Sequence, residues 1–310
     1  MKRINLWMAV ATLAALSGGC VTNKGVTSKK NIPVPARPVA LNATKEELLD
    51  KYDAFASSVN SLNATVELKT TAGSQYSGLI QEYHEVKAFL LASRPENVRM
   101  VGQAPVIGKT IFDMSSDGKE FRVWLPTKNK FLTGEVAVDR SSEKPLENLR
   151  PQHLLDALLW TEVRKEETTL PEEFNDESAR YYILTVLRGG YRPEILRKIW
   201  FDRSNLNIVR LQSYGPKGAL LSDVHYADWQ PVSDSAAGSA PAASSQLTFP
   251  RSLRIDRPHD DYSLNLQVTK IDLNVDLPAD RFQLPQPAGA DIVRVSADNA
   301  TKQPAKDAHP

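Results

Sequence analysis

Hydrophobic periodicity predicts an amphipathic helix followed directly by a strand near residue 45. Thr44 and Glu47 have the spacing of a capping box, which marks a helix start. The apolar positions behind it fall on one helical face: Leu48, Tyr52, Phe55 and Val59. Residues 62–69 then alternate between apolar and polar, as in a half-buried strand. The helix therefore needs an apolar sheet surface to cover.

Similar alternation continues through most of the chain. It predicts strands at 79–92, 97–103, 110–116, 121–126, 129–134, 180–188, 194–202, 206–214, 219–229, 248–257 and 261–275. Asp117-Gly118 predicts a tight hairpin turn. A second, short helix is predicted at 150–160, because Pro151 suits its first turn and four leucines form a stripe: Leu154, Leu155, Leu158 and Leu159.

Eleven or twelve antiparallel strands with two or three helices predict a mainly β (α+β) fold. We expect one strongly curved sheet, a half-open antiparallel barrel of about 11 strands, with the helices on its concave side. A two-sheet sandwich is the alternative. The curved sheet is favoured because both amphipathic helices need an apolar surface.

The N-terminus has the pattern of an export signal. Lys2 and Arg3 precede an eleven-residue apolar run, which is too short to span a bilayer. Leu16-Ser17-Gly18-Gly19-Cys20 resembles a bacterial lipobox, and that resemblance implies an acylated Cys20. Ordinary signal cleavage near Ser17 is the alternative. Because Val21 rather than Asp follows the cysteine, the resemblance also implies sorting to the outer membrane.

These features divide the chain into four parts. Residues 1–19 are the predicted lipoprotein signal peptide, and 20–43 form a polar, lipidated tether with several Lys and Pro. Residues 44–285 form the folded domain, which contains a low-complexity loop at 233–246. Residues 286–310 are predicted to be a disordered tail.

Composition excludes several classes of protein. The chain of 310 residues has 38 basic and 37 acidic side chains, a balance that offers no attraction to nucleic acid. Its single cysteine excludes a disulfide framework within the chain and a cysteine-rich metal site. No cofactor is expected.

Enzyme-like signals are weak. His84-Glu85 begins a zinc-protease motif, but Ala88 stands where the second histidine is needed. Asp223 and His225 share a strand face, with Asp228 beyond. They could hold a metal, although polar strand faces commonly look like this. Phosphate-loop, dinucleotide and nucleophile-elbow motifs are missing, so we expect a protein that is not an enzyme and has no metal site.

One stretch resembles a known family. It runs from Arg94-Pro95-Glu96-Asn97-Val98-Arg99 through Pro105 and Ser116-Asp117-Gly118-Lys119 to Trp124-Leu125-Pro126. This pattern is similar to the lipoprotein-localisation factors, the periplasmic lipoprotein carrier and its outer-membrane receptor. The helix and strand at 45–70 and the ending at 277–285 also fit. The resemblance implies a half-open barrel with a helical lid over an apolar cavity that takes acyl chains.

The resemblance also implies roles for particular residues. The cavity would be lined by Ala64, Val66, Leu68, Val98, Met100, Phe121 and Val123, and the lid would include Tyr52, Phe55, Leu155 and Leu158. Val106 and Ile107 correspond to an exposed apolar loop that enters a membrane or partner; alternatively they tuck under the sheet. Arg99 either grips the lid from the cavity or is a solvated strand residue, and the sequence favours the latter.

We therefore expect an outer-membrane-anchored, periplasm-facing lipoprotein that binds acyl chains of lipoproteins or lipids and transfers them to the membrane. Its partners would be those acyl chains, the membrane through its lipid anchor, and a periplasmic carrier protein. Two alternatives stay open. One is a periplasmic sensor or interaction module that regulates a membrane partner. The other is a structural lipoprotein without cargo, which would have a filled interior.

Overall fold

The computed structural model describes residues 39–73, 80–137, 148–176, 179–232 and 247–295. Two α-helices occur in these ranges, α2 (Lys45–Ser58) and α3 (Pro151–Leu158). Short 3-10 turns are η1 (Pro126–Lys128), η3 (Pro216–Gly218) and η5 (Ala279–Phe282). The strands are β1 (Ser61–Ala72), β2 (Gln81–Glu82), β3 (Val86–Ser93), β4 (Asn97–Gln103), β5 (Thr110–Ser116), β6 (Glu120–Leu125), β7 (Lys130–Glu135), β8 (Thr168–Asn175), β9 (Arg180–Arg188), β10 (Glu194–Asp202), β11 (Ile208–Tyr214), β12 (Leu220–Val232), β13 (Leu247–Arg257), β14 (Tyr262–Leu273) and β15 (Asp291–Val295).

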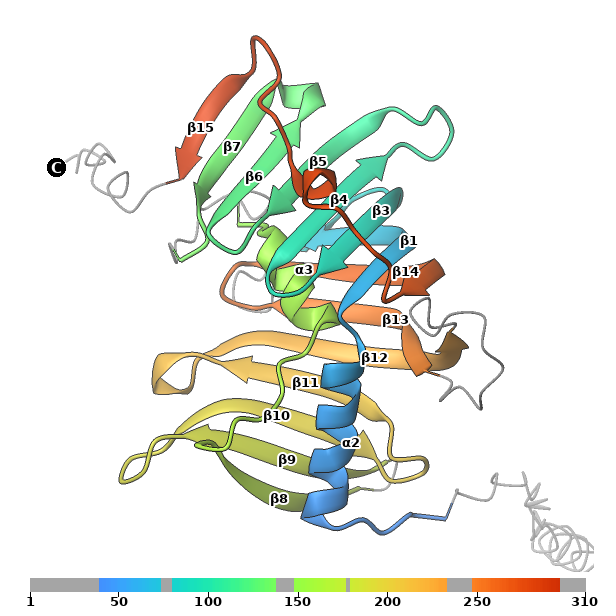
Figure 1. Ribbon diagram of the computed structural model, residues 1–310, viewed down its shortest axis with the longest axis vertical. Coiled ribbons are helices and arrows are strands. Elements are labelled where there is room, and N and C mark those ends of the chain that lie inside the picture. Colours follow the sequence, from blue (N-terminus) through green and yellow to red (C-terminus); the bar gives the residue numbers. More distant parts are fainter. Residues whose placement is uncertain (1–38, 74–79, 138–147, 177–178, 233–246, 296–310) are drawn as a thin grey trace, which may run out of the picture. The chain divides into compact units, whose positions relative to one another are not determined.

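All these strands belong to a single open sheet (Figure 1). Its order is β15-β7-β6-β5-β4-β3-β1-β14-β13-β12-β11-β10-β9-β8, with β2 paired to β1. β1 lies near the middle and pairs antiparallel with β3 on one side and β14 on the other. The mainly β prediction is thus confirmed. In the described part of the chain the sheet has fifteen strands rather than about eleven, and its outermost strands β15 and β8 do not pair with each other, so the sheet is open.

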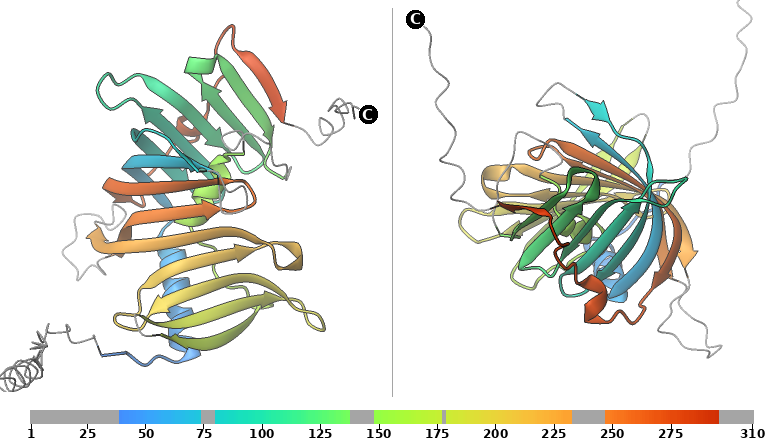
Figure 2. Two further views of the ribbon diagram at one scale, coloured as in Figure 1. Left: turned by 180° about the vertical axis from the view of Figure 1, so that it is seen from behind. Right: turned by 90° about the horizontal axis from the view of Figure 1, so that it is seen from above.

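Alternating side chains give the sheet one apolar and one polar face. In β1, Ala64, Val66 and Leu68 are buried. The residues between them are half-buried or exposed, and this period of two is the one read from the sequence. Both helices lie on the apolar face; the reverse view in Figure 2 shows them behind the strands. α3 packs against β4 and β5, and α2 against β9.

The start of α2 follows its sequence signal. Glu47 donates its backbone N–H to the Thr44 hydroxyl at 3.2 Å, and Thr44 donates its own N–H to the Glu47 carboxylate at 2.8 Å. The predicted capping box is therefore confirmed. Within the described residues, no helix combines the length and the apolar character that crossing a membrane needs.

Three segments differ from the prediction. β8 was not predicted because it is an exposed edge strand with Pro171 and two glutamates in place of alternation. The predicted strand at 79–92 is interrupted and forms β2 and β3. Residues 291–295, predicted as part of a disordered tail, form β15, which pairs parallel with β7. Such pairing depends on a distant strand and leaves no local pattern.

The predicted tether and loops lie mostly outside the described residues. These include the signal peptide, Cys20, the loop at 233–246 and residues 296–310. The last tether residues are described, and they are held by the sheet. Leu41 donates its N–H to the carbonyl of Arg203 at 2.7 Å, and the Arg203 guanidinium donates to the Asn42 side chain at 3.1 Å.

Candidate functional site

The residues predicted to line a cavity all lie on the apolar face of the sheet. Each is almost fully buried: Ala64, Val66, Leu68, Val98, Met100, Phe121 and Val123. Three of the four predicted lid residues, Tyr52, Leu155 and Leu158, belong to the same hydrophobic cluster, and Phe55 packs against it. We call α2, α3 and the following Trp160 the lid. The residues named from the sequence therefore lie together in the structure, and there they form one packed core.

Aromatic side chains fill the space between the lid and the sheet. The rings of Tyr52 and Trp160 stack with centroids 5.6 Å apart, and the Phe55 ring lies 4.2 Å from Trp160. The Trp160 indole N–H donates to the Tyr226 hydroxyl on β12 at 2.9 Å. Phe55 also meets Phe249 on β13, with centroids 6.1 Å apart. The lid's own side chains therefore occupy the interior that the resemblance implies to be an acyl cavity.

Arg94, the first residue after β3, holds both parts of the lid. Its Nη2 donates to the carbonyls of Ala56 in α2 and Trp160 after α3, both at 2.6 Å, and its Nε donates to the Val59 carbonyl at 3.1 Å. α2 has no basic residue in its last turn. The guanidinium therefore supplies the positive charge and the donors that the carbonyls at a helix C-terminus lack.

Arg94 is a site residue that the sequence reasoning missed. The Arg94-Pro95 pair was noticed as part of the family pattern, whereas the lid-gripping role was considered for Arg99. In the structure Arg99 neither faces the lid nor is solvated. It pairs with Asp113 at 2.8 Å and donates to the carbonyls of Arg281 and Gln283, each at 3.0 Å.

Arg99 instead fixes a C-terminal segment to the opposite face of the sheet. Phe282 and Leu284 in this segment are buried, so apolar packing accompanies the hydrogen bonds from Arg99. Asn129 donates its side chain to the Gly289 carbonyl at 3.0 Å, and β15 follows directly. The segment runs across β4 to the edge strand β15, as Figure 1 shows in red.

The predicted apolar loop is exposed. Residues 104–109, which we call the tip, connect β4 to β5 and project from the sheet at the upper right of Figure 1. Val106 and Ile107 are 95% and 73% exposed, which excludes the alternative that they tuck under the sheet in this structure. The turn is closed by the N–H of Ala104 bonding to the Lys109 carbonyl at 2.9 Å. Gly108 has a φ of +63°, a conformation that favours glycine.

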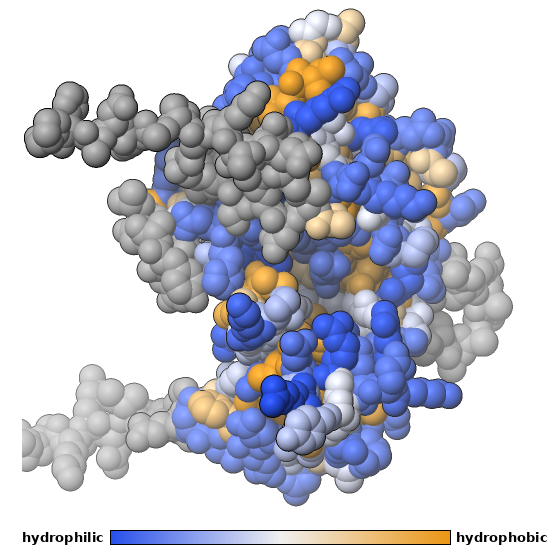
Figure 3. All heavy atoms as spheres, turned by 90° about the vertical axis from the view of Figure 1, so that its left-hand side faces the viewer, coloured by the Kyte–Doolittle hydropathy of each residue, from blue (hydrophilic) through white to orange (hydrophobic). Residues whose placement is uncertain are grey.

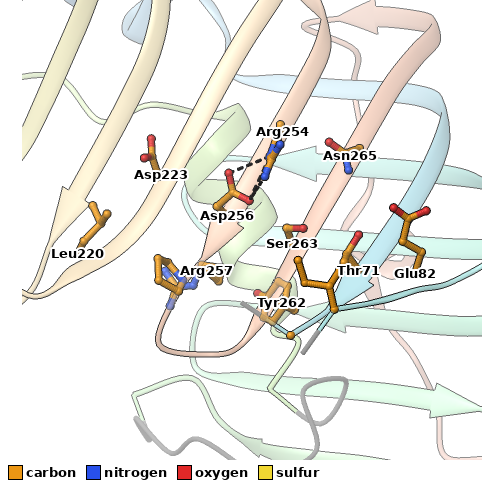
Figure 4. Close-up of a pocket in the computed structure, with 13 residues that line it drawn as sticks. Thr71, Glu82, Leu220, Asp223, Arg254, Asp256, Arg257, Tyr262, Ser263 and Asn265 are labelled. Carbon is orange, nitrogen blue, oxygen red and sulfur yellow. Dashed lines mark hydrogen bonds and ion pairs between the residues drawn. The ribbon is translucent and has the colours of Figure 1, made fainter. Parts of the chain in front are cut away.

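A polar groove of about 490 Å³ crosses the ends of β12, β13, β14 and β1 (Figure 4). Arg254 and Asp256, adjacent in the close-up, form an ion pair of 3.0 Å. Asp223 accepts hydrogen bonds from Arg210. The groove therefore carries charges of both signs that neutralise each other. Neither an excess of one charge nor an apolar lining favours one class of ligand in this groove.

The metal site that Asp223, His225 and Asp228 could form is not assembled. His225 lies 3.4 Å from Asp223, but Arg210 already occupies that carboxylate. Asp228 accepts from Gln230 instead. Nowhere in the described part of the chain do three His, Cys, Asp or Glu side chains gather closely enough to hold a metal ion.

The surface beside these elements is mainly hydrophilic. Figure 3 shows one side of the molecule, where blue side chains predominate and orange ones form small separate groups. The tip therefore differs from most of the exposed surface in presenting two bulky apolar neighbours at one turn. Isolated exposed apolar residues are ordinary in proteins, whereas adjacent ones on a projecting turn favour a binding role.

Comparisons with known proteins give structural likeness only. No family model and no curated protein matches the sequence. A LolA superfamily protein from Nitrosomonas europaea is similar in structure, with 15% identity over 78% of this chain and 99% of that one, and a TM-score of 0.46. A DUF1329 family protein from Desulfovibrio piger has 14% identity, coverage of 76% and 94%, and a TM-score of 0.46.

A third similar structure is a putative outer membrane lipoprotein-sorting protein domain from Vibrio parahaemolyticus. It has 13% identity, coverage of 76% and 94%, and a TM-score of 0.43. The first and third of these proteins bear the name of the class that the sequence motifs resemble. All three TM-scores are below 0.5, so the function proposed for this chain rests on its own residues.

Proposed function

We propose that this protein binds the acyl chains of lipids or lipoproteins between the sheet and the lid, and transfers them to a membrane. The observation that carries the proposal is the covering of the apolar sheet face by two short helices. Helices make their backbone hydrogen bonds internally, so they can move away without breaking the sheet. A second sheet covering the same face could not separate strand by strand without breaking hydrogen bonds between its strands.

The free energy of burying an acyl chain is large enough to offset the cost of displacing side chains of the lid. Burying a chain is worth about 0.8 kcal/mol per methylene, which gives roughly 12 kcal/mol for sixteen carbons. Displacing the lid costs the burial of a few large side chains, at about 1.5–3 kcal/mol each. Tyr52, Phe55 and Trp160 are the side chains whose place the acyl chain would take.

The tip supplies the membrane contact in this proposal. Val106 and Ile107 would enter the interfacial region of the periplasmic leaflet, and Lys109 beside them would meet anionic headgroups. An acylated Cys20 would anchor the chain to the periplasmic face of the outer membrane, where a periplasmic carrier could deliver cargo. The proposed activity is binding and transfer, without catalysis.

The packed interior also favours a second candidate, a structural lipoprotein without cargo. In that case the aromatic cluster would be permanent core. A sensor or interaction module would use the tip on a protein partner instead. The proposed function differs from these two candidates because it requires an acyl chain to reach Trp160.

Quenching by a brominated C16 fatty acid tests the proposal, using the mature chain with Cys20→Ser. Bromine quenches tryptophan fluorescence on contact, so we expect saturable quenching of Trp160. The Trp229 ring lies 6.2 Å from that of Trp160, so both matched variants also carry Trp229→Phe. In that background Trp160→Phe should lose most of the quenching, and Trp200→Phe should retain it. Trp200 lies on the polar face, next to Gln212, to which it donates at 3.1 Å.

Native mass spectrometry of the same protein, purified from bacterial extract, provides an independent readout. A bound acyl species of defined mass would support the proposal and identify the cargo. An empty protein that also shows no quenching would contradict acyl binding. A structural or interaction role would then be the better explanation.

A further inference from the structure

A polar contact on α3 has no part in the acyl-binding role described above. Although Leu154, Leu155 and Leu158 of this helix enter the core, His153 turns to the hairpin between β13 and β14. Its Nδ1 lies 2.5 Å from the Tyr262 hydroxyl, and its Nε2 lies 3.0 Å from Nη2 of Arg257. We call His153, Arg257 and Tyr262 the latch, because they join the lid to the sheet.

The chemistry of arginine fixes the protonation state of the histidine. A guanidinium has only donors, so Nε2 of His153 must accept the hydrogen bond from Arg257. The imidazole is then neutral, and its remaining hydrogen sits on Nδ1, which donates to Tyr262. A second proton on Nε2 would remove the acceptor and place two positive groups 3.0 Å apart.

The charges that act most on His153 are those of two arginines, Arg257 and Arg150. Arg257 comes from β13, and its Nε donates to the Asp260 carboxylate at 2.7 Å, which holds the guanidinium in place. Arg150 precedes α3 and is buried, with its guanidinium 4.4 Å from the centre of the Phe121 ring. Burial and the charges of these two arginines hold the pKa of His153 well below its usual value.

Acidic and neutral groups near α3 complete the surroundings. Asp156 lies one turn along the helix, and desolvation raises its pKa to about 6, while the charge of Arg257 opposes that rise. Glu96, in the turn between β3 and β4, accepts a 3.5 Å bond at its carbonyl from Gln152. Tyr262, on β14, stays neutral because burial raises its pKa. The carboxylate in direct contact with the latch is that of Asp260, and it is already paired with Arg257.

We propose that the latch is an acid-sensitive catch, in which protonation of His153 breaks its bond to Arg257 and frees α3 from the β13–β14 hairpin. This inference rests on the proposed function for its purpose, since a freed α3 is one half of the opened lid. Arg94 holds the other end, at Trp160. The latch and Arg94 thus fix α3 near its two ends.

The direction of the pH effect follows from linkage. The closed state lowers the pKa of His153, so closure is fully stabilised above the free histidine's pKa, about 6.5. As pH falls below that value, closure weakens until the closed-state pKa is reached. Within this window each pH unit changes the equilibrium constant between the closed and released states by up to about tenfold, in favour of release.

Backbone amide exchange tests the latch without any ligand. In the mature chain with Cys20→Ser, and after correction for intrinsic rates, protection of α3 should fall about fivefold from pH 6.5 to 5.5. Protection of β9, far from the latch, should stay constant as an internal reference. His153→Gln keeps an acceptor for Arg257 but does not titrate, so the fall in α3 protection should disappear. Asp156 still titrates in this variant, but its raised pKa stabilises the closed state as pH falls, so it acts in the opposite direction.

A second variant guards against poor folding of the first. Arg257→Gln retains a donor for His153 without the positive charge, so the pH step should be smaller than in the parent protein. Equal steps in the parent and in both variants, or no step in the parent, would overturn the latch. Acyl quenching at constant pH is measured separately. If the pH step fails while acyl quenching is normal, the latch alone is wrong. If quenching fails while the pH step is present, the proposed acyl binding alone is wrong.

Discussion

The Arg94 guanidinium and the Trp160 carbonyl are joined by a 2.6 Å hydrogen bond, made by the same Nη2 that donates to Ala56. One side chain from the turn between β3 and β4 therefore holds the end of α2 and the segment that follows α3 together. The carbonyls it satisfies are partly buried, and their alternative partner is water. Any opening of the lid must break this contact.

Replacing Arg94 with methionine should loosen the lid. Arg94→Met leaves the carbonyls of Ala56, Val59 and Trp160 without their donor, and we expect a loss of about 2–3 kcal/mol in the free energy of unfolding. Chemical denaturation measures the loss. Amide exchange should increase most at the C-terminal turn of α2.

The matched control is Arg188→Met. Arg188 forms an exposed ion pair with Glu194 at 3.6 Å, which contributes little. We expect its stability to stay within about 0.5 kcal/mol of the parent. If both variants lost the same stability, Arg94 would have no special role in holding the lid.

Charged residues at the tip should prevent membrane contact without affecting the fold. Val106 and Ile107 are exposed, so Val106→Glu with Ile107→Glu should change the free energy of unfolding by less than about 0.5 kcal/mol. Binding to vesicles should be lost, because two carboxylates would have to enter the bilayer interface. Co-sedimentation of the Cys20→Ser protein with anionic vesicles gives the measurement.

Tyr191→Glu provides the comparison for the tip. Tyr191 is 94% exposed in the loop between β9 and β10, so it is an apolar surface residue outside the tip. Its replacement should leave vesicle binding unchanged. Normal binding by the folded double variant, or equal loss in the Tyr191 variant, would remove the tip from the mechanism.

The sequence pattern predicted those features of the fold that neighbouring residues determine. Tyr52 and Leu155 could be assigned to buried helix faces because the neighbouring apolar positions recur at helical spacing. Val106 and Ile107 stood out because bulky apolar residues are unusual between Pro105 and Gly108. Each of these assignments depends only on residues that are close together in the sequence.

Contacts between distant residues could not be read in the same way. The partners of Arg94 are 35 to 66 positions away, and those of His153 are more than 100 positions away. Nothing local distinguishes such a side chain from a solvated one. The filled interior is also a tertiary property, since it depends on how closely Phe55 approaches Phe249.

Buried tyrosines should make the fold sensitive to alkali. Burial raises the pKa of Tyr52 from its usual 10 to about 12. Its folded-state pKa is the higher one, so its contribution is complete below pH 10 and declines as pH rises toward 12. The free energy of unfolding should fall by up to about 1.4 kcal/mol per pH unit from this group.

Tyr52→Phe isolates that contribution. The variant loses the 2.9 Å bond to the Thr161 carbonyl, so its stability at pH 8 should drop by about 1 kcal/mol. Its decline between pH 10 and 12 should be shallower than that of the parent. Tyr191→Phe, at an exposed position, should keep the parent slope. Identical slopes in all three proteins would show that Tyr52 ionises without unfolding.

Gly102 on β4 leaves room for an aromatic ring from the neighbouring strand. A Cβ added there would overlap the ring of Phe112, which lies directly opposite on β5. Gly102→Ala should therefore push the ring aside and cost about 1–3 kcal/mol in the free energy of unfolding. Because this hairpin carries the tip, the substitution should also weaken vesicle binding.

A double variant separates the steric effect from any other. Phe112→Ala alone should lose stability because a partly buried ring is removed. Adding Gly102→Ala to it should then cost almost nothing, since the overlapping ring is gone. The coupling energy from the four proteins measures the close approach. Additive losses would mean that the two residues do not crowd each other, and that the shape of the hairpin beneath the tip has another cause.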